Sequence, residues 1–124
     1  MEELLAEAKA LVLKYGDYVQ EQNLTAILES ICEDAHFEIL QRSPIAGKEA
    51  IREFYESNFA EGSFSFNVEI TDEKSVSDIV FISGVMNRIH TPEGQASESI
   101  KMNFSFVLKK EDERLKIWQC RFAR

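Results

Sequence analysis

Cysteine, proline and glycine are scarce in this sequence, which has two, two and five of them among 124 residues. Cys32 and Cys120 are too few for a disulfide-rich scaffold, and their apolar surroundings predict a protein of the reducing cytoplasm. No apolar run approaches the roughly 18 residues of a membrane helix, and the N-terminus lacks the basic region of a signal peptide, so no membrane association is expected. The net charge of −8 argues against nucleic acid or acidic lipid as the main partner.

The negative charge is concentrated in the first half of the chain. Residues 1–62 hold 5 Lys/Arg and 13 Asp/Glu, whereas residues 63–124 hold 9 of each. The acidic half has helical periodicity and the neutral half alternates like strands, which is the order of helices and sheet in an α+β domain. No Pro/Gly/Ser-rich linker or repeat divides the chain, so we expect one domain over residues 1–124.

Three helices are expected in the first half. Apolar residues recur every three or four positions over residues 2–21, the pattern of an amphipathic helix. Gly16 interrupts this helix at a typical cost of about 1 kcal/mol relative to alanine, and a close packing contact would account for it. Asn23 is suited to cap a second, short helix. Gly47 opens the third, after a strand over residues 34–40 that Pro44 ends.

The second half is predicted to form four consecutive strands. Phe64, Phe66, Val68 and Ile70 alternate with polar residues, and turns are expected at residues 72–75, 91–94 and 111–113. The segment 77–90 is apolar on both faces in its middle, which predicts a central strand. Short connections indicate an antiparallel meander whose inner face is covered by the helices.

Three segments of this chain are similar to a known family. The stretches 23–28 (NLTAIL), 33–37 (EDAHF) and 45–55 (IAGKEAIREFY) resemble the nuclear transport factor 2-like superfamily, within it the SnoaL-like and ketosteroid isomerase-like small proteins. Gly84 and Trp118 in the strand region fit the same pattern. The resemblance implies a cone-shaped, cystatin-like roll in which a strongly curved sheet wraps the long helix around an apolar pocket. It implies little about activity, because this fold carries several kinds of enzyme and non-catalytic binders.

The implied pocket combines side chains of the long helix, the third helix and the inner sheet face. Carried over by register, its lining comprises Tyr15, Val19, Phe37, Ile39, Phe54, Tyr55, Val80, Ile82, Met86, Arg88, Met102, Phe104, Phe106, Trp118, Cys120 and Phe122. The outer sheet face comprises Ile79, Phe81, Val85, Val107 and Ile117. Such an apolar row is unusual for a monomer, and the resemblance implies a homodimer through this face.

The resemblance argues against steroid isomerisation in this chain. Isomerases of the family use an aspartate base, with a tyrosine and a protonated aspartate as oxyanion donors. Tyr15 matches the tyrosine, but the base position is Ile39 and the second acid position is Phe106. Neither replacement can move a proton. Tyr15 is then interpreted either as a ligand donor or as a core residue with a hydrogen-bonded hydroxyl.

Arg88 and His90 are the remaining candidates for chemistry. Arg88 is expected on the pocket side, where it either pairs with a carboxylate such as Glu98 at the rim or receives the carboxylate or enolate of a small ligand. His90 ends the same strand and is expected near the pocket mouth. A general acid or base needs a partner that fixes its tautomer, so His90 is a weak catalytic candidate.

No metal or cofactor is expected. The chain has no paired His or Cys spacing of a metal site, His36 and His90 belong to separate strands, and the glycines are too scattered for a phosphate loop. Three hypotheses stay open: a binder of a small hydrophobic or aromatic molecule oriented by Tyr15 and Arg88, a cyclase- or isomerase-type enzyme using Tyr15, His90 or Arg88, and a dimerisation module without ligand chemistry. The lack of an inward Asp, Glu or His with a partner favours the binder.

Overall fold

The computed structural model describes residues 2–39 and 42–123, and in these residues three helices pack with a six-stranded sheet. Two strands of the sheet lie between the second and third helices in the chain, and the other four follow the third helix. The elements are α1 (Glu2–Gln20), α2 (Leu24–Glu29), β1 (Ile31–Ile39), β2 (Ile45–Ala46), α3 (Lys48–Phe59), β3 (Ser63–Val76), β4 (Ile79–Thr91), β5 (Glu98–Glu111) and β6 (Arg114–Ala123). The predicted α+β fold is confirmed. No helix in the described part of the chain is long and apolar enough to cross a bilayer.

The three predicted helices begin where the sequence indicates. Asn23 caps α2, because its side-chain oxygen accepts a hydrogen bond from the backbone N–H of Ala26 at 3.2 Å. Gly47 precedes α3 with φ 92°, a conformation that favours glycine. β1 begins at Ile31, before the predicted start at residue 34, and the predicted end of this strand at Leu40 lies outside the described residues.

The sheet has the strand order β2-β1-β6-β5-β4-β3. Strands β3 to β6 form the predicted antiparallel meander, and β1 pairs in parallel with β6 at its other side. The turn expected at residues 72–75 was wrong: β3 continues to Val76 and the chain reverses at Ser77, whose φ is 57°. The pairing of β3 with β4 shifts in register between Ile70 and Asp72, and the residues after this shift are mostly exposed and several are charged. This part of the strand therefore has no alternation of apolar residues from which it could be predicted.

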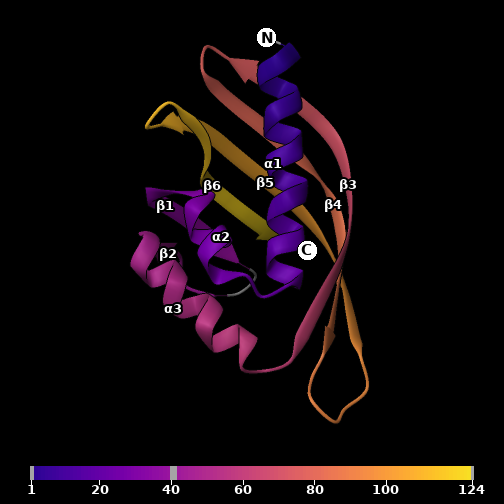
Figure 1. Ribbon diagram of the computed structural model, residues 1–124. Coiled ribbons are helices and arrows are strands. Elements are labelled where there is room, and N and C mark those ends of the chain that lie inside the picture. The colour runs from indigo at the N-terminus through magenta and orange to yellow at the C-terminus, as the bar shows by residue number, and fades with distance from the viewer. Residues whose placement is uncertain (1, 40–41, 124) are drawn as a thin grey trace.

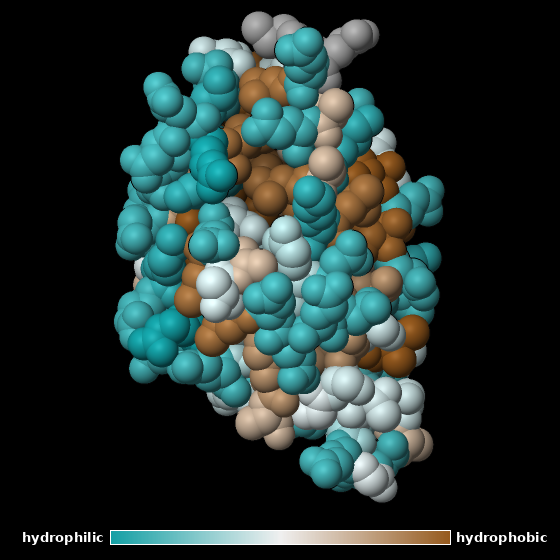
Figure 2. Space-filling model, viewed as in Figure 1, coloured by the Kyte–Doolittle hydropathy of each residue, from teal (hydrophilic) through white to brown (hydrophobic). Residues whose placement is uncertain are grey.

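The sheet curves around α1, as Figure 1 shows, while α2 and α3 lie beside β1 and β2. The apolar stripe of α1 faces the sheet, with Ala8, Val12, Tyr15 and Val19 buried. Hydrophilic residues cover most of the helical side of the molecule, and hydrophobic ones appear in the gaps beside α1 (Figure 2). The core therefore lies between α1 and the concave face of the sheet.

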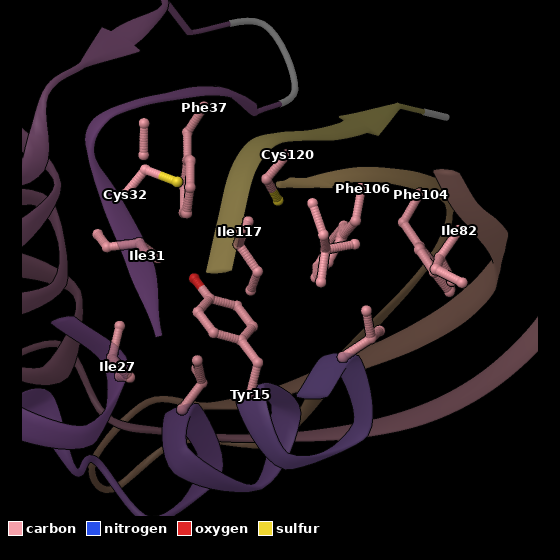
Figure 3. Packing of buried hydrophobic residues seen from close by; sticks show 14 of the residues in the cluster. Tyr15, Ile27, Ile31, Cys32, Phe37, Ile82, Phe104, Phe106, Ile117 and Cys120 are labelled. Carbon is pink, nitrogen blue, oxygen red and sulfur yellow. The ribbon is translucent and has the colours of Figure 1, made fainter. Parts of the chain in front are cut away.

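An irregularity in β6 reverses the predicted faces of two neighbouring residues. Val107 pairs with Gln119 and Leu108 pairs with Ile117, so Trp118 is the extra residue of a β-bulge. Ile117, which was expected on the outer face, is fully buried in the core near Tyr15 (Figure 3). Trp118, which was expected in the pocket, lies on the outer face with Phe81 and Val107. Both assignments were wrong because one inserted residue exchanges the two faces of a strand.

Candidate functional site

A cavity of about 80 Å³ lies between α1, α3 and the concave face of the sheet. It is partly open to solvent. Its lining residues are Val12, Tyr15, Gly16, Val19, Ile39, Phe54, Tyr55, Asn58, Phe59, Phe64, Phe66, Val68, Met86, Arg88, Met102, Phe104, Phe106 and Phe122. The wall is apolar and largely aromatic, and its polar side chains are two tyrosines, one asparagine and one arginine.

Most of the predicted lining residues surround this cavity, and a few do not. Those around it are Tyr15, Val19, Ile39, Phe54, Tyr55, Met86, Arg88, Met102, Phe104, Phe106 and Phe122. Those expected there but buried elsewhere in the core are Phe37, Val80, Ile82 and Cys120. They were placed on the correct face, but Phe106 stands opposite both Ile82 and Cys120, and the ring of Tyr15 packs edge-on against Phe37 at 6.4 Å. Phe106 and Tyr15 thus line the cavity and are direct neighbours of three of these four residues.

Part of the cavity wall was missed by the sequence analysis. Phe64, Phe66 and Val68 alternate clearly in the sequence but reach the cavity only because the curved sheet brings β3 against α1. Gln20 fixes this contact, since its side-chain oxygen accepts a hydrogen bond from the Phe66 N–H at 3.2 Å. Asn58 lies one helical turn after Phe54, and Phe59 lies one turn after Tyr55. The helical period could therefore have predicted that both residues face the cavity.

Tyr15 and Tyr55 form the buried polar pair of the site. Their hydroxyl groups are hydrogen-bonded to each other, and their rings meet edge-to-face with centroids 6.3 Å apart. Tyr15 projects from α1 toward Ile117, in the centre of the core (Figure 3). Burial raises the pKa of both phenols well above the ordinary value near 10. Both side chains are therefore neutral at physiological pH, and the pair still has one O–H free to donate outside it.

Arg88 and His90 lie along one side of Phe64, but only Arg88 lines the cavity. The guanidinium carbon of Arg88 is 5.6 Å from the Phe64 ring centre, a cation–π distance. His90 stacks on the same ring at 4.5 Å, and its Nε2 lies 3.3 Å from the carbonyl oxygen of Glu61. In the β4–β5 register Glu98 stands opposite His90, whereas Arg88 faces Ile100. His90 therefore supports the aromatic wall from outside.

A second cluster of potential ligand atoms lies away from the cavity. One atom each of Cys32, Asp34 and Glu111 falls within 4.8 Å of the others. Lys109 pairs with Asp34 at 3.4 Å and Lys116 with Glu111 at 3.6 Å, so ammonium groups already balance the carboxylates. Burial, with the charge of Glu111, raises the pKa of Cys32 to about 11, which keeps the thiol protonated. Sequence spacing could not reveal this cluster because Glu111 is far from β1 in the chain.

Comparison with known proteins identifies related folds. Residues 8–122 match the family model described as SnoaL-like domain. A ketosteroid isomerase-like protein from Erwinia carotovora atroseptica SCRI1043 superposes with a TM-score of 0.88 at 18% identity, covering 98% of this chain and 96% of that chain. A protein from Novosphingobium aromaticivorans described as NTF2-like with a cystatin-like fold superposes with a TM-score of 0.79 at 14% identity, covering 95% of this chain and 79% of that chain. An NTF2-like protein of unknown function from Pseudomonas putida KT2440 superposes with a TM-score of 0.82 at 11% identity, covering 99% of this chain and 87% of that chain. No curated protein matches the chain.

Proposed function

The chain belongs to the SnoaL-like domain family, and we propose that it is a small-molecule-binding protein whose ligand occupies the cavity between α1 and the sheet. The observation that carries this proposal is the composition of the wall: aromatic and aliphatic side chains nearly throughout, with a few convergent polar groups. Apolar concave sites with few polar groups are typical of small-molecule pockets. We infer that the ligand is hydrophobic or aromatic.

The size of the cavity limits the ligand to one ring inside it. A volume of about 80 Å³ is smaller than the roughly 150 Å³ of an engineered cavity that binds benzene. A ring that enters this site must extend toward the open mouth or displace the flexible side chains of Met86 and Met102. We therefore propose a monocyclic aromatic compound.

The polar groups of the wall would orient such a ring. The Tyr15–Tyr55 pair can donate one hydrogen bond from the buried end of the site. Arg88 carries a permanent positive charge on the same wall and can receive a carboxylate substituent. We propose that ring substituents with oxygen acceptors bind at these two places.

Binding is favoured over proton-transfer chemistry by the groups that line the cavity. Among the described lining residues there is no Asp, Glu or His. The raised pKa values of Tyr15 and Tyr55 keep both phenols protonated, so neither serves as a base near neutral pH. A cyclase- or isomerase-type reaction would need a base from another source.

The test is a ligand-dependent thermal shift with three small probes. We expect p-cresol and benzoate to raise the melting temperature in proportion to log concentration, because they bind the folded state alone. Cyclohexanol, which has a hydroxyl but no planar ring, should raise the melting temperature less at the same concentration. The variant Val68→Trp places a large ring in the cavity and should lose the shift, whereas Leu13→Trp, on the exposed side of α1, should keep it. No shift of the wild-type protein with millimolar p-cresol or benzoate would refute the proposal.

We also propose that two copies of the chain pair through the outer sheet face. Val76 and Phe81 are 53% and 44% exposed there and, with Ile79, Val107 and Trp118, line an open hollow. The outward positions of β4 from Ile79 to Asn87 are uncharged, although 29% of the chain is charged. Charged residues border this row, since Lys74 stands opposite Phe81 and the Lys109 ammonium lies 4.2 Å from the Trp118 ring centre. The proposed interface therefore has an apolar centre along β4 and a charged rim, as protein interfaces commonly do.

We place the protein in the reducing cytoplasm. Both Cys32 and Cys120 are free and buried. Buried free thiols persist where the environment does not drive disulfide formation.

A further inference from the structure

Gly16 has no structural reason to be a glycine. It lies inside α1, and no left-handed φ sets it apart from its helical neighbours. A Cβ atom built on it would have no heavy atom within 4 Å beyond its own helix backbone and chain neighbours. The close packing contact that the sequence analysis expected is therefore not there. By contrast, a Cβ at Gly84 would collide with the carbonyl oxygen of Glu69 and lie 2.9 Å from Ile70 Cα.

The open space beside Gly16 belongs to the cavity. Gly16 is one of the lining residues, between Val12 and Val19 on the same side of α1. Gln20, one turn further on, is hydrogen-bonded to the backbone of β3 at Phe66. This bond joins the end of α1 to β3, the strand that contributes Phe64, Phe66 and Val68 to the same cavity.

We propose that Gly16 is a specificity-determining residue, which allows the planar ring of the ligand to lie directly against the backbone of α1. This inference rests on the proposed binding function. A flat ring fits between a helix backbone without a side chain and the aromatic wall of β3. Any side chain at position 16 would project into the same space. Glycine in a helix interior is less stable than alanine, and the packing of α1 does not require it at position 16. Space for the ligand ring accounts for Gly16.

The experiment compares p-cresol binding by calorimetry in the wild-type protein and in Gly16→Ala, Gly16→Leu and Asp17→Ala. The control Asp17→Ala changes the next, exposed residue of α1 and also favours the helix, but adds nothing to the cavity. We expect both alanine variants to melt a few degrees higher than wild type. Gly16→Ala should bind p-cresol about tenfold more weakly, since a methylene-sized change in a pocket alters affinity by this order. Gly16→Leu should bind it more weakly still, and Asp17→Ala should bind it like wild type.

Two failures can be distinguished. If wild type binds p-cresol and Gly16→Ala binds it equally well, the inference about Gly16 is wrong and the binding function stands. If wild type binds neither p-cresol nor benzoate, the proposed function is wrong and the inference falls with it. A lower melting temperature of Gly16→Ala would also overturn the inference, because it would show that packing requires the glycine.

Discussion

The phenol hydroxyls of Tyr15 in α1 and Tyr55 in α3 are hydrogen-bonded to each other inside the core, although the two residues are 40 positions apart. Both side chains are buried, at 3% and 5% exposure, so water cannot readily replace a lost partner. A buried hydroxyl without a partner costs about 1–3 kcal/mol, while removing both partners together costs far less. The pair therefore couples α1 to α3 as well as lining the cavity.

We predict that Tyr15→Phe and Tyr55→Phe each lower the free energy of unfolding by about 1–3 kcal/mol. The double variant should be no less stable than either single variant, because neither hydroxyl is then left unpaired. Urea unfolding of all three proteins measures these differences. Tyr18→Phe, on α1 but outside this pair, is the control and should change stability little. Additive losses in the double variant would contradict the coupling.

The same burial predicts that stability decreases at alkaline pH. The pKa values of Cys32, Cys120, Tyr15 and Tyr55 are all raised in the folded protein, that of Cys32 to about 11, chiefly by burial. A group that holds its proton more tightly when folded contributes stability fully below its unfolded pKa and loses it as pH rises above that value. The unfolded thiols are half ionised near pH 9 and the unfolded phenols near pH 10, so their ionisation begins about one pH unit lower.

We therefore expect the free energy of unfolding to be nearly constant from pH 7 to 8 and to fall above about pH 8.5. Each titrating group contributes a limiting slope of about 1.4 kcal/mol per pH unit. Urea unfolding at intervals between pH 7 and 10 measures the slope. The variant Cys32→Ala should have a shallower slope between pH 9 and 10 than wild type. Equal slopes would show that Cys32 is not buried as a protonated thiol.

Local patterns in the sequence are sufficient to predict the helices and most strands. The stripe of α1, the cap at Asn23 and the glycine before α3 are each set by residues within a few positions of one another. The meander of β3 to β6 follows for the same reason, because short connections leave neighbouring strands few other arrangements. The inner residues of β5 that line the cavity follow from alternation, whereas those of β4, which is apolar on both faces in its middle, were assigned through the register of the resembling family.

The features that the sequence did not predict depend on contacts between distant segments or on an irregularity in a strand that no local pattern indicates. Ile117 and Trp118 are both apolar, so the hydrophobic pattern is compatible with either register, and the bulge is visible only in the pairing of β6 with β5. The contribution of β3 to the cavity depends on the curvature of the whole sheet. The proximity of Cys32 and Glu111 depends on strands that are far apart in the chain.

Gly84 is predicted to be required by packing. Its missing side chain lets β4 lie close to the bulged part of β3, where a Cβ would collide with the Glu69 carbonyl oxygen and approach the Phe104 ring at 2.9 Å. We expect Gly84→Ala to lower the free energy of unfolding by about 1–3 kcal/mol, the usual cost of overpacking. Urea unfolding checks this, and Gly16→Ala, which adds the same methyl group where there is space, should be more stable than wild type. Equal stability of Gly84→Ala and wild type would show that the strands can separate without cost.

Arg88 is predicted to select for ligands with a carboxylate. Its guanidinium lines the cavity near Phe64, so Arg88→Met keeps an apolar stem but removes the charge. We expect this variant to bind benzoate at least about tenfold more weakly than wild type, since a charge-assisted hydrogen bond is worth about 1.5–3 kcal/mol. Its affinity for the neutral p-cresol should be nearly unchanged. Calorimetry with both probes makes the comparison, and an equal loss for both would assign Arg88 a structural role.

The outer face provides a prediction about assembly that is independent of the cavity. Phe81 and Leu13 are 44% and 47% exposed, but Phe81 lies on the convex side of the sheet and Leu13 on the solvent side of α1. If two copies pair through the outer face, Phe81→Glu buries a charge in the interface and should produce monomers, whereas Leu13→Glu should leave the dimer intact. Sedimentation velocity or size-exclusion chromatography with light scattering at micromolar concentration measures the mass. Wild-type protein that is monomeric under these conditions would exclude the dimer, and dissociation by Leu13→Glu alone would assign the interface to the helices.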